Sequence, residues 1–282
     1  MEVLHTIDGL RQELDAQRSR GKSVGFVPTM GALHAGHRSL MERSVDDNDL
    51  TVVSIFVNPL QFGPNEDLAK YPRTLDADSQ VARNAGADYV FAPSVEEMYP
   101  TGLVLTSVHV DELTDVLDGL ARPGHFDGVA TVVTKLFAIV GACRAYFGEK
   151  DWQQLMVVKR LAVDLSLPVE VIGCPIIRDI DGLALSSRNV YLSGEERDAA
   201  LAVSRALHTA MALTEQGNRS PLDLITAMTD VLAEEPLVKT EYAAVVGPDM
   251  KVPSTVNKHS RLLVAARVGE TRLIDNLGVL QS

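Results

Sequence analysis

Residues 24–37 read Val24-Gly25-Phe26-Val27-Pro28-Thr29-Met30-Gly31-Ala32-Leu33-His34-Ala35-Gly36-His37. The run begins as a short apolar strand, which Pro28 ends. It passes through Gly31, a residue that tolerates unusual backbone angles, and leads into a helix that begins near His37. A strand, a glycine turn and a helix in direct succession predict the start of an α/β domain.

The same alternation of strands and helices continues to about residue 177. The predicted strands are nearly apolar throughout and lie at 24–27, 50–57, 88–91, 103–110, 144–147 and 169–172. The predicted helices lie at 7–14, 33–48, 75–85, 129–140 and 152–164. Apolar strands separated by helices indicate a parallel sheet that is covered on both faces. Right-handed crossovers then give a doubly wound, Rossmann-like α/β sheet, which binds ligands beyond the carboxyl ends of its strands.

The pattern changes in the last third of the chain. Helices are expected to begin at Ser193, with an acidic first turn, and at Ser220-Pro221. Three strands are expected to follow them, at 242–246, 262–268 and 272–274. Helices followed by strands predict a smaller C-terminal α+β domain, so we divide the chain into domains 1–177 and 178–282.

The composition excludes several classes of protein. The 282 residues include 26 Lys+Arg and 38 Asp+Glu, a net charge of −12, which argues against a nucleic-acid partner. The hydrophobic share of 46% excludes wholesale disorder. The longest apolar stretch, 136–143, is far below the roughly 20 residues of a membrane span. The N-terminus lacks the pattern of a secretory signal, and Cys143 and Cys174 read as buried thiols, so we expect a cytoplasmic protein without a membrane partner.

The turn after the first predicted strand carries two histidines, His34 and His37. A helix N-terminus attracts phosphate, and both imidazoles can project toward one ligand because they are three residues apart. The pair could instead be half of a zinc site or a chance feature of a surface turn. However, no Cys/His cluster completes a zinc site, and the usual dinucleotide and P-loop fingerprints are absent.

His34-Ala35-Gly36-His37 resembles the His-x-Gly-His signature of the nucleotidyltransferase superfamily, which includes the class I aminoacyl-tRNA synthetases. Leu185-Ser186-Ser187-Arg188-Asn189 resembles the mobile second loop of that superfamily. Longer blocks, in order along the chain, resemble the pantoate–β-alanine ligase family; they lie at 26–41, 57–63, 71–74, 122–126, 147–155 and 181–184. The resemblance implies that ATP and pantoate give pantoyl adenylate and pyrophosphate, and that β-alanine then releases pantothenate and AMP. It also implies a homodimer, and we expect the second domain to form a lid over the active site.

The resemblance implies the site residues as well. The nucleotide would contact Met30, Gly31, Ala32, Leu33, His34, Ala35, Gly36, His37, Gly148, Glu149, Lys150, Asp151, Ile177, Leu185, Ser186, Ser187 and Arg188. Four of these, His34, His37, Lys150 and Arg188, would act on the reacting phosphates, with His37 as the proton donor. Asp151 could instead be only a helix cap and Ile177 only a core residue. Leu185 stands where the family commonly has Met, a change of similar volume.

The substrate and metal residues follow in the same way. The resemblance implies that Gln61 and Gln154 bind pantoate, with Arg122 and His125 as further candidates. The non-functional alternatives are a solvated glutamine and a surface ion pair of Arg122. Mg²⁺ would be held mainly by phosphates and water, with Asp78 as its protein ligand, because Ala77 replaces a second acid of some members. Capping of the helix N-terminus by Asp76 is the alternative role for this segment.

Two other functions remain open at this stage. One is transfer of a nucleotide to a phosphorylated acceptor, but the neutral Gln61 and Gln154 argue against such an acceptor. The other is a non-catalytic nucleotide sensor, which would not need both histidines and the Gly148-Glu149-Lys150-Asp151 segment.

Overall fold

The computed structural model describes residues 1–64, 66, 68–102 and 104–279, and the chain forms two compact units. The N-terminal unit comprises Met1–Glu149 and Gln153–Pro175. The C-terminal unit comprises Lys150–Trp152 and the chain from Ile176 onward. Each unit has its own sheet and its own helices, and each is described below by itself.

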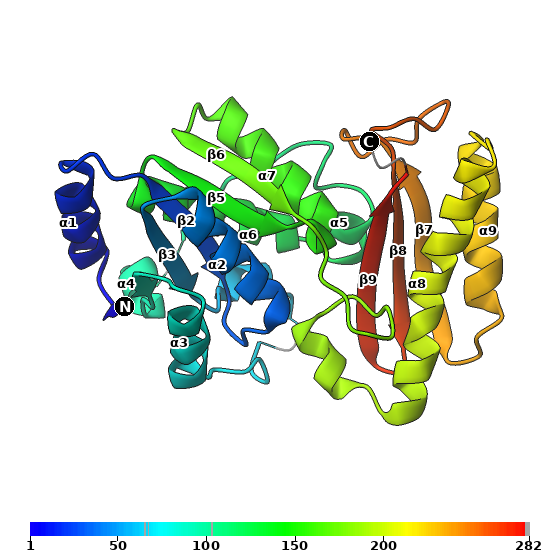
Figure 1. Ribbon diagram of the computed structural model, residues 1–282, viewed down its shortest axis with the longest axis horizontal. Coiled ribbons are helices and arrows are strands. Elements are labelled where there is room, and N and C mark those ends of the chain that lie inside the picture. Colours follow the sequence, from blue (N-terminus) through cyan, green and yellow to red (C-terminus); the bar gives the residue numbers. More distant parts are fainter. Residues whose placement is uncertain (65, 67, 103, 280–282) are drawn as a thin grey trace. The chain divides into compact units, whose positions relative to one another are not determined.

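The N-terminal unit is built on a parallel sheet of six strands in the order β1-β4-β3-β2-β5-β6 (Figure 1). The strands are β1 (Glu2–Leu4), β2 (Val24–Thr29), β3 (Leu50–Ile55), β4 (Tyr89–Phe91), β5 (Cys143–Gly148) and β6 (Val169–Cys174). β2 lies between β3 and β5. The strands that follow β2 in the chain are first added on the β3 side of the sheet and later, from β5, on the other side. The predicted doubly wound sheet is confirmed, and its topological switch point lies at the carboxyl end of β2.

Helices cover both faces of this sheet, as Figure 1 shows. They are α1 (Ile7–Arg18), α2 (Ala35–Asp47), α3 (Leu75–Asn84), α4 (Val95–Met98), α5 (Asp118–Ala121), α6 (His125–Val140) and α7 (Trp152–Asp164), with 3₁₀ turns η1 (Pro59–Gln61) and η2 (Glu149–Asp151). Neighbouring residues of β2 point to opposite faces. Phe26 contacts Phe137 of α6, with ring centroids 6.5 Å apart, whereas Val27 packs in a buried cluster with Leu40 and Met41 of α2. Burial on both faces explains why the strands are apolar throughout.

The structure departs from the sequence-based description at three places. β1 was not predicted, because it has only three residues, one of which is the exposed Glu2. It is a strand only because its backbone pairs with β4. The strand expected over 103–110 is wrong for the described residues 104–110, which lie outside any sheet; there the Val108 N–H donates to the Thr131 hydroxyl of α6 instead of a ladder partner. Lys150–Trp152, expected in the first domain, groups with the C-terminal unit.

The C-terminal unit consists of an antiparallel sheet of three strands in the order β7-β8-β9, packed against two helices. Its elements are η3 (Ser187–Tyr191), α8 (Gly194–Glu215), α9 (Pro221–Ala233), β7 (Val238–Val246), β8 (Arg261–Val268) and β9 (Thr271–Gly278). Ser193 caps α8 in a capping box with Glu196, and Pro221 begins α9, as the sequence predicts. The predicted α+β architecture is therefore confirmed.

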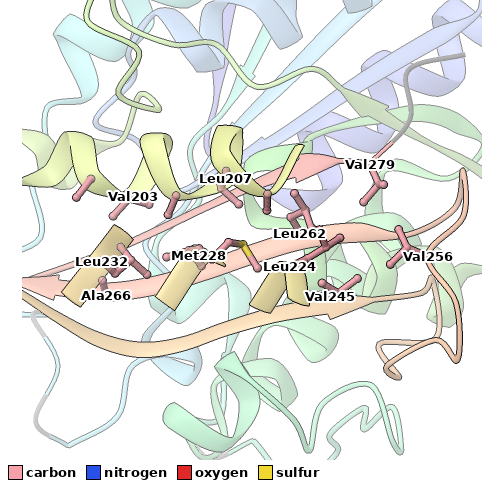
Figure 2. Close-up of a cluster of buried hydrophobic side chains, with 14 residues drawn as sticks. Val203, Leu207, Leu224, Met228, Leu232, Val245, Val256, Leu262, Ala266 and Val279 are labelled. Atoms are coloured by element: carbon pink, nitrogen blue, oxygen red, sulfur yellow. The ribbon is translucent and has the colours of Figure 1, made fainter. Parts of the chain in front are cut away.

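A large cluster of buried side chains packs the two helices of the C-terminal unit against its sheet (Figure 2). Leu207 of α8 and Leu224 of α9 meet Val245 of β7 and Leu262 of β8 in this cluster, and all four are fully buried. Among the residues described, none of the helices combines the length and the hydropathy that a bilayer crossing requires.

We expect Leu207→Ala to lower the free energy of unfolding of the C-terminal unit by about 2–5 kcal/mol, because it leaves a cavity in this cluster. Leu222→Ala on α9 is the matched control, since 70% of the Leu222 surface is exposed, and we expect it to cost less than about 0.5 kcal/mol. Urea unfolding followed by circular dichroism measures both. Equal effects of the two substitutions would contradict this description of the core.

Candidate active site

The turn between β2 and α2 bends through two consecutive residues with positive φ, Gly31 (+85°) and Ala32 (+51°). Thr29 stabilises its entrance: the Thr29 hydroxyl donates to the Ser54 carbonyl at 2.7 Å and accepts from the Gly31 N–H at 3.2 Å. A Cβ atom on Gly31 would lie 3.0 Å from an Asp78 carboxylate oxygen. Glycine is therefore required at position 31 both for its φ angle and for this close approach.

Asp78 of α3 holds the turn from the other side, with only 3% of its surface exposed. Its Oδ2 accepts from the Ala32 N–H at 3.1 Å and its Oδ1 from the Leu33 N–H at 2.7 Å. The Thr74 hydroxyl donates to Oδ2 at 3.1 Å. A buried carboxylate is tolerated because these donors replace water. Asp78 thus fixes the backbone onto which the sequence places the nucleotide.

His34 and His37 lie at the start of helix α2, which begins at Ala35, within the range of starts from 33 to 37 that the sequence predicts. His34 is the N-cap, and its Nδ1 accepts from the Gly36 N–H at 3.1 Å. The His37 Nδ1 lies 3.4 Å from the His34 N–H, and the two ring centroids are 4.2 Å apart. Since Nδ1 is the acceptor in each ring, a neutral imidazole carries its proton on Nε2. Both rings are thereby set to donate a hydrogen bond through Nε2.

Gln61 lies at the end of η1, directly after β3, and is 8% exposed. Its Oε1 accepts from Asn58 Nδ2 at 3.2 Å, and its Nε2 lies 2.7 Å from the sulfur of Met30. The structure therefore brings the predicted substrate residue Gln61 together with the predicted nucleotide residue Met30. Asn58 orients the Gln61 amide.

Asn58 is itself fully engaged in the interior, at 1% exposure. Its Nδ2 donates to the Gly128 carbonyl at 3.1 Å, and its Oδ1 accepts from the Tyr99 hydroxyl at 2.8 Å. Burial raises the pKa of Tyr99 to about 12, so Tyr99 stays protonated and keeps its role as a donor. A Cβ on Gly128 would lie 2.2 Å from the Leu60 carbonyl oxygen, so helix α6 packs directly on η1.

Arg122 and His125 belong to a second network behind Gln61. Arg122 pairs with Glu66 through Nε–Oε1 (2.7 Å) and Nη2–Oε2 (2.8 Å), and its Nη1 lies 2.8 Å from His125 Nε2. His125 Nδ1 lies 2.8 Å from the Gln61 carbonyl oxygen. Donation from Arg122 to Nε2 and from Nδ1–H to Gln61 requires a neutral imidazole. In this conformation Arg122 therefore forms an ion pair with Glu66, which was the alternative role considered for it. Contact between Arg122 and pantoate stays a prediction.

The electrostatics of this network agree with that protonation state. Burial, together with the nearby Arg122 charge, lowers the pKa of His125 to about 4. Burial opposes ionisation of Glu66, but the hydrogen bonds and charge of Arg122 outweigh it and lower the pKa of Glu66 to about 2. Near neutral pH, Glu66 is charged and His125 is neutral.

The two glutamines at the start of α7 have different roles. Gln153 is 2% exposed and structural: its Oε1 accepts from the Asp118 N–H, and its Nε2 donates to the carbonyls of Leu113 and Val116. Gln154 is half-buried, and its amide makes no hydrogen bond to any residue that the structure describes. This leaves the Gln154 amide able to serve the substrate role that the sequence predicts.

The C-terminal unit gathers most of the remaining predicted nucleotide residues. A hairpin over residues 178–184, here called the 178–184 hairpin, is closed by a bridge between Arg178 and Ala184. The Leu185 N–H then donates to the Ile177 carbonyl at 3.0 Å, which places these two predicted residues side by side. Ser186 caps η3 by accepting from the Arg188 N–H at 3.2 Å. Ile177, Leu185 and the Ser186–Arg188 loop thus form one continuous structure.

Lys150 also belongs to the C-terminal unit. Its carbonyl oxygen accepts from Asn276 Nδ2 at 2.8 Å, and its Nζ lies 3.7 Å from the Asp151 carboxylate. The Arg261 guanidinium lies 3.8 Å from the centre of the Trp152 ring. These contacts explain why Lys150–Trp152 departs from the predicted domain assignment, while Gly148 and Glu149 remain in the N-terminal unit.

A protein cage for a metal ion is not found in the described part of the chain, where no group of three or more His, Cys, Asp or Glu is arranged to hold one. Mg²⁺ does not need such a cage when phosphates and water supply most of its ligands. Asp78 already accepts three hydrogen bonds, so a metal ion bound there would compete with the turn residues. Its role as a metal ligand stays a prediction.

Sequence reasoning missed the residues that support Gln61. Asn58, Tyr99 and Glu66 are distant in sequence from most of their partners, and only the Asn58-Pro59 step directly after a strand could have drawn attention to Asn58. Glu66 carries no local signal at all, because its role depends on Arg122, which lies 56 residues further along the chain.

We expect His125 to make the protein less stable in mild acid. The folded-state pKa of about 4 lies below the ordinary 6.5, so the contribution of neutral His125 is fully present above pH 6.5 and is lost as the pH falls toward 4. Relative to His125→Gln, which cannot take up a proton, the wild-type free energy of unfolding should fall by up to about 1.4 kcal/mol per pH unit between pH 6 and 4.5. Denaturant unfolding at several pH values measures this difference, and parallel pH profiles would contradict it.

Comparison with known proteins agrees with the geometry. Residues 2–278 match the family described as pantoate-beta-alanine ligase. The chain is 53% identical over 278 residues to the pantothenate synthetase of Rhizobium rhizogenes, which covers 98% of this chain and 95% of that protein.

Two solved structures are also similar. The crystal structure of pantothenate synthetase from Thermus thermophilus has a TM-score of 0.94 at 48% identity, with both chains fully covered. The pantoate-beta-alanine ligase from Francisella tularensis, solved in complex with beta-gamma ATP and beta-alanine, has a TM-score of 0.80 at 34% identity over 99% of this chain and 98% of that one. The turn at His34 and His37, the sheet and the C-terminal unit all lie within the matched residues, and the chain belongs to the pantoate–β-alanine ligase family.

Proposed function

We propose that this chain makes pantothenate through a pantoyl-adenylate intermediate, with the described residues in the roles given below. The overall reaction, the ATP-dependent condensation of pantoate with β-alanine, follows from membership of the family. The observation that carries the proposed mechanism is the turn at the carboxyl end of β2. There Asp78 fixes the backbone, and His34 and His37 each keep Nε2 as the donor nitrogen at the start of α2.

In the first step, a carboxylate oxygen of pantoate attacks the α-phosphorus of ATP. The bond from that phosphorus to the bridging oxygen breaks, and pyrophosphate leaves with the electron pair. Negative charge grows on the phosphate oxygens during this step. Donors held in advance stabilise it: the Nε2 atoms of His34 and His37 and the positive end of the α2 dipole.

The β- and γ-phosphates suit the groups of the C-terminal unit. Lys150 offers a compact positive charge, Arg188 a planar fork of donors, and Ser186 and Ser187 hydroxyl groups. Their common membership of one compact unit supports a shared role. Ile177 and Leu185, which lie next to each other, offer apolar surface to the adenine base.

In the second step, the neutral amine of β-alanine attacks the acyl carbon of pantoyl adenylate and AMP leaves. Gln61 and Gln154 carry no charge, and each can donate and accept, which suits the hydroxyl groups and the carboxyl group of pantoate. The Gln61 amide is oriented by Asn58, while the Gln154 amide has no partner among the residues described. Arg122, held by Glu66, is the proposed positive charge near the substrate carboxylate.

Four further features belong to this proposal. Mg²⁺ would accompany the triphosphate and neutralise part of its charge, with Asp78 as the candidate protein ligand. The C-terminal unit would act as a lid, and the chain would form a homodimer, as the family resemblance implies. A cytoplasmic location is supported by the two free cysteines, Cys143 and Cys174, because unpaired thiols are typical of a reducing compartment.

The direct test is incubation of the purified protein with ATP, Mg²⁺, pantoate and β-alanine. We expect pantothenate, AMP and pyrophosphate in equal amounts, measured by mass spectrometry and a coupled pyrophosphate assay. With pantoate but without β-alanine, we expect an enzyme-bound adenylate and at most one equivalent of pyrophosphate. AMP release that does not depend on both organic substrates would refute the proposed reaction.

We expect His37→Ala and His34→Asn to lower the rate of adenylation by about 10²–10³-fold each, because each removes a donor to the developing charge. Asn is the informative replacement at position 34, since it is a good N-cap and keeps the start of α2 intact. Single-turnover pyrophosphate release measures the rates, and circular dichroism controls for folding. Near-normal activity of either variant would remove that histidine from the mechanism.

A further inference from the structure

We propose that Asp275 and Asn276, two consecutive residues of β9, are positioning residues that hold both nucleotide-binding segments of the C-terminal unit in fixed geometry. Asn276 holds the backbone of Lys150, and Asp275 holds the 178–184 hairpin that leads into Ser186–Arg188. This inference rests on the proposed roles of Lys150 and Arg188 in binding the triphosphate.

Asn276 contacts Lys150 directly and Trp152 through Arg261. Its Nδ2 donates to the Lys150 carbonyl at 2.8 Å, and its Oδ1 accepts from Arg261 Nε at 2.6 Å. The same guanidinium stacks on the ring of Trp152, 3.8 Å from the ring centre. Asn276 and Arg261 are 2% and 9% exposed, so water does not compete effectively with these contacts. Residues 150–152 are therefore held at Lys150 by Asn276 and at Trp152 by Arg261.

Asp275 acts on the 178–184 hairpin. Its carboxylate pairs with both terminal nitrogens of Arg178, at 2.6 and 2.9 Å, and Arg178 Nη1 also donates to the Gly182 carbonyl at 3.1 Å. Asp275 is 4% exposed. A bidentate pair of this kind fixes orientation as well as distance. Arg197 of α8 holds the outer side of the hairpin through Asp179 and Asp181.

The two residues serve different faces of one strand. Neighbouring side chains of a strand point to opposite faces, so Asp275 and Asn276 diverge. Leu262 and Val264 of β8 face the cluster with α8 and α9, which leaves Arg261 on the other face, where it meets Asn276. The Asn276 N–H also donates to the Asp275 carboxylate at 2.7 Å, which links the two contacts directly. One short stretch of β9 thus fixes two segments that lie far from each other in the sequence.

Buried polar groups that have hydrogen-bond partners hold one geometry, because a displacement leaves a buried donor or acceptor without its partner. Residues that orient a ligand-binding group typically change affinity or activity by about 10–100-fold when they are replaced. Since β- and γ-phosphates take part only in the first step, loss of these contacts should slow adenylation and spare the attack of β-alanine.

The test uses two nearly isosteric substitutions in the full-length protein. Asn276→Asp keeps an acceptor for Arg261 but replaces the N–H donor to Lys150 with an oxygen. Asp275→Asn keeps the shape of the side chain but removes the charge that pairs with Arg178. The matched control is Glu241→Gln, which breaks the ion pairs of β7 with Arg267 and Arg272 in the same sheet.

We expect each β9 variant to lower kcat of pantoate-dependent ATP–pyrophosphate exchange by about 10–100-fold, with less than about a threefold change in the reaction of preformed pantoyl adenylate with β-alanine. Hydrogen exchange read by mass spectrometry should accelerate at 150–152 in Asn276→Asp and at 178–188 in Asp275→Asn. Glu241→Gln should match the wild type in all of these measurements.

The inference is overturned if both β9 variants match Glu241→Gln, or if both steps slow equally. Should either variant fail to fold, Arg178→Lys and Arg261→Lys replace it, because each keeps the charge but loses the planar contacts, and the same outcomes apply. The proposed function is tested separately: it fails if the wild type makes no pantothenate, and the hydrogen-exchange result then still decides whether β9 holds the two segments.

Discussion

A buried carboxylate and the backbone amides that it satisfies underlie the N-terminal part of the site. Taking Asp78 out of water is costly, and the cost is offset only because Ala32, Leu33 and Thr74 donate to it. In return, Asp78 holds the backbone as it leaves two consecutive residues with positive φ, Gly31 and Ala32, while the Thr29 hydroxyl holds the Gly31 N–H at the entrance. The position of His34 at the helix cap, and hence the direction of both imidazoles, follows from that bend.

Gln61 is held by neutral groups, whereas the turn at Gly31 is held by a buried charge. Asn58, from the turn after β3, donates to its amide, and His125, from the start of α6, contacts its carbonyl. Both groups are neutral; Tyr99 holds Asn58, and the Arg122–Glu66 pair lies behind His125. Under the proposed function, the neutral Gln61 amide would recognise the hydroxyl groups of pantoate by direction.

Local pattern predicted most of the fold, whereas contacts that are distant in sequence remained hidden. The strand that begins at Val24, the turn at Gly31, the Ser193 cap and the start of α9 at Pro221 follow from short-range rules, although β2 runs on through Pro28 to Thr29 instead of ending at Pro28. Partners such as Glu66 and Arg122 depend on how the elements pack, which no local rule contains. The same limit explains the error at 104–110, where a run that looks like a strand bonds to a helix side chain instead of a ladder. The family resemblance implied the candidate roles, but the residues that hold the candidate side chains in place, such as Asn58 and Glu66, could be found only in the structure.

The divergence of Asp275 and Asn276 also limits how the C-terminal sheet can change. A one-residue slip of β9 against β8 would turn Asp275 toward Arg261 and move Asn276 into the apolar cluster with α8 and α9. Lys150–Trp152 and the 178–184 hairpin would then lose these contacts at once. The register of β8 and β9 is therefore fixed by polar contacts on one face and by apolar packing on the other, so neither strand can slide without losing both.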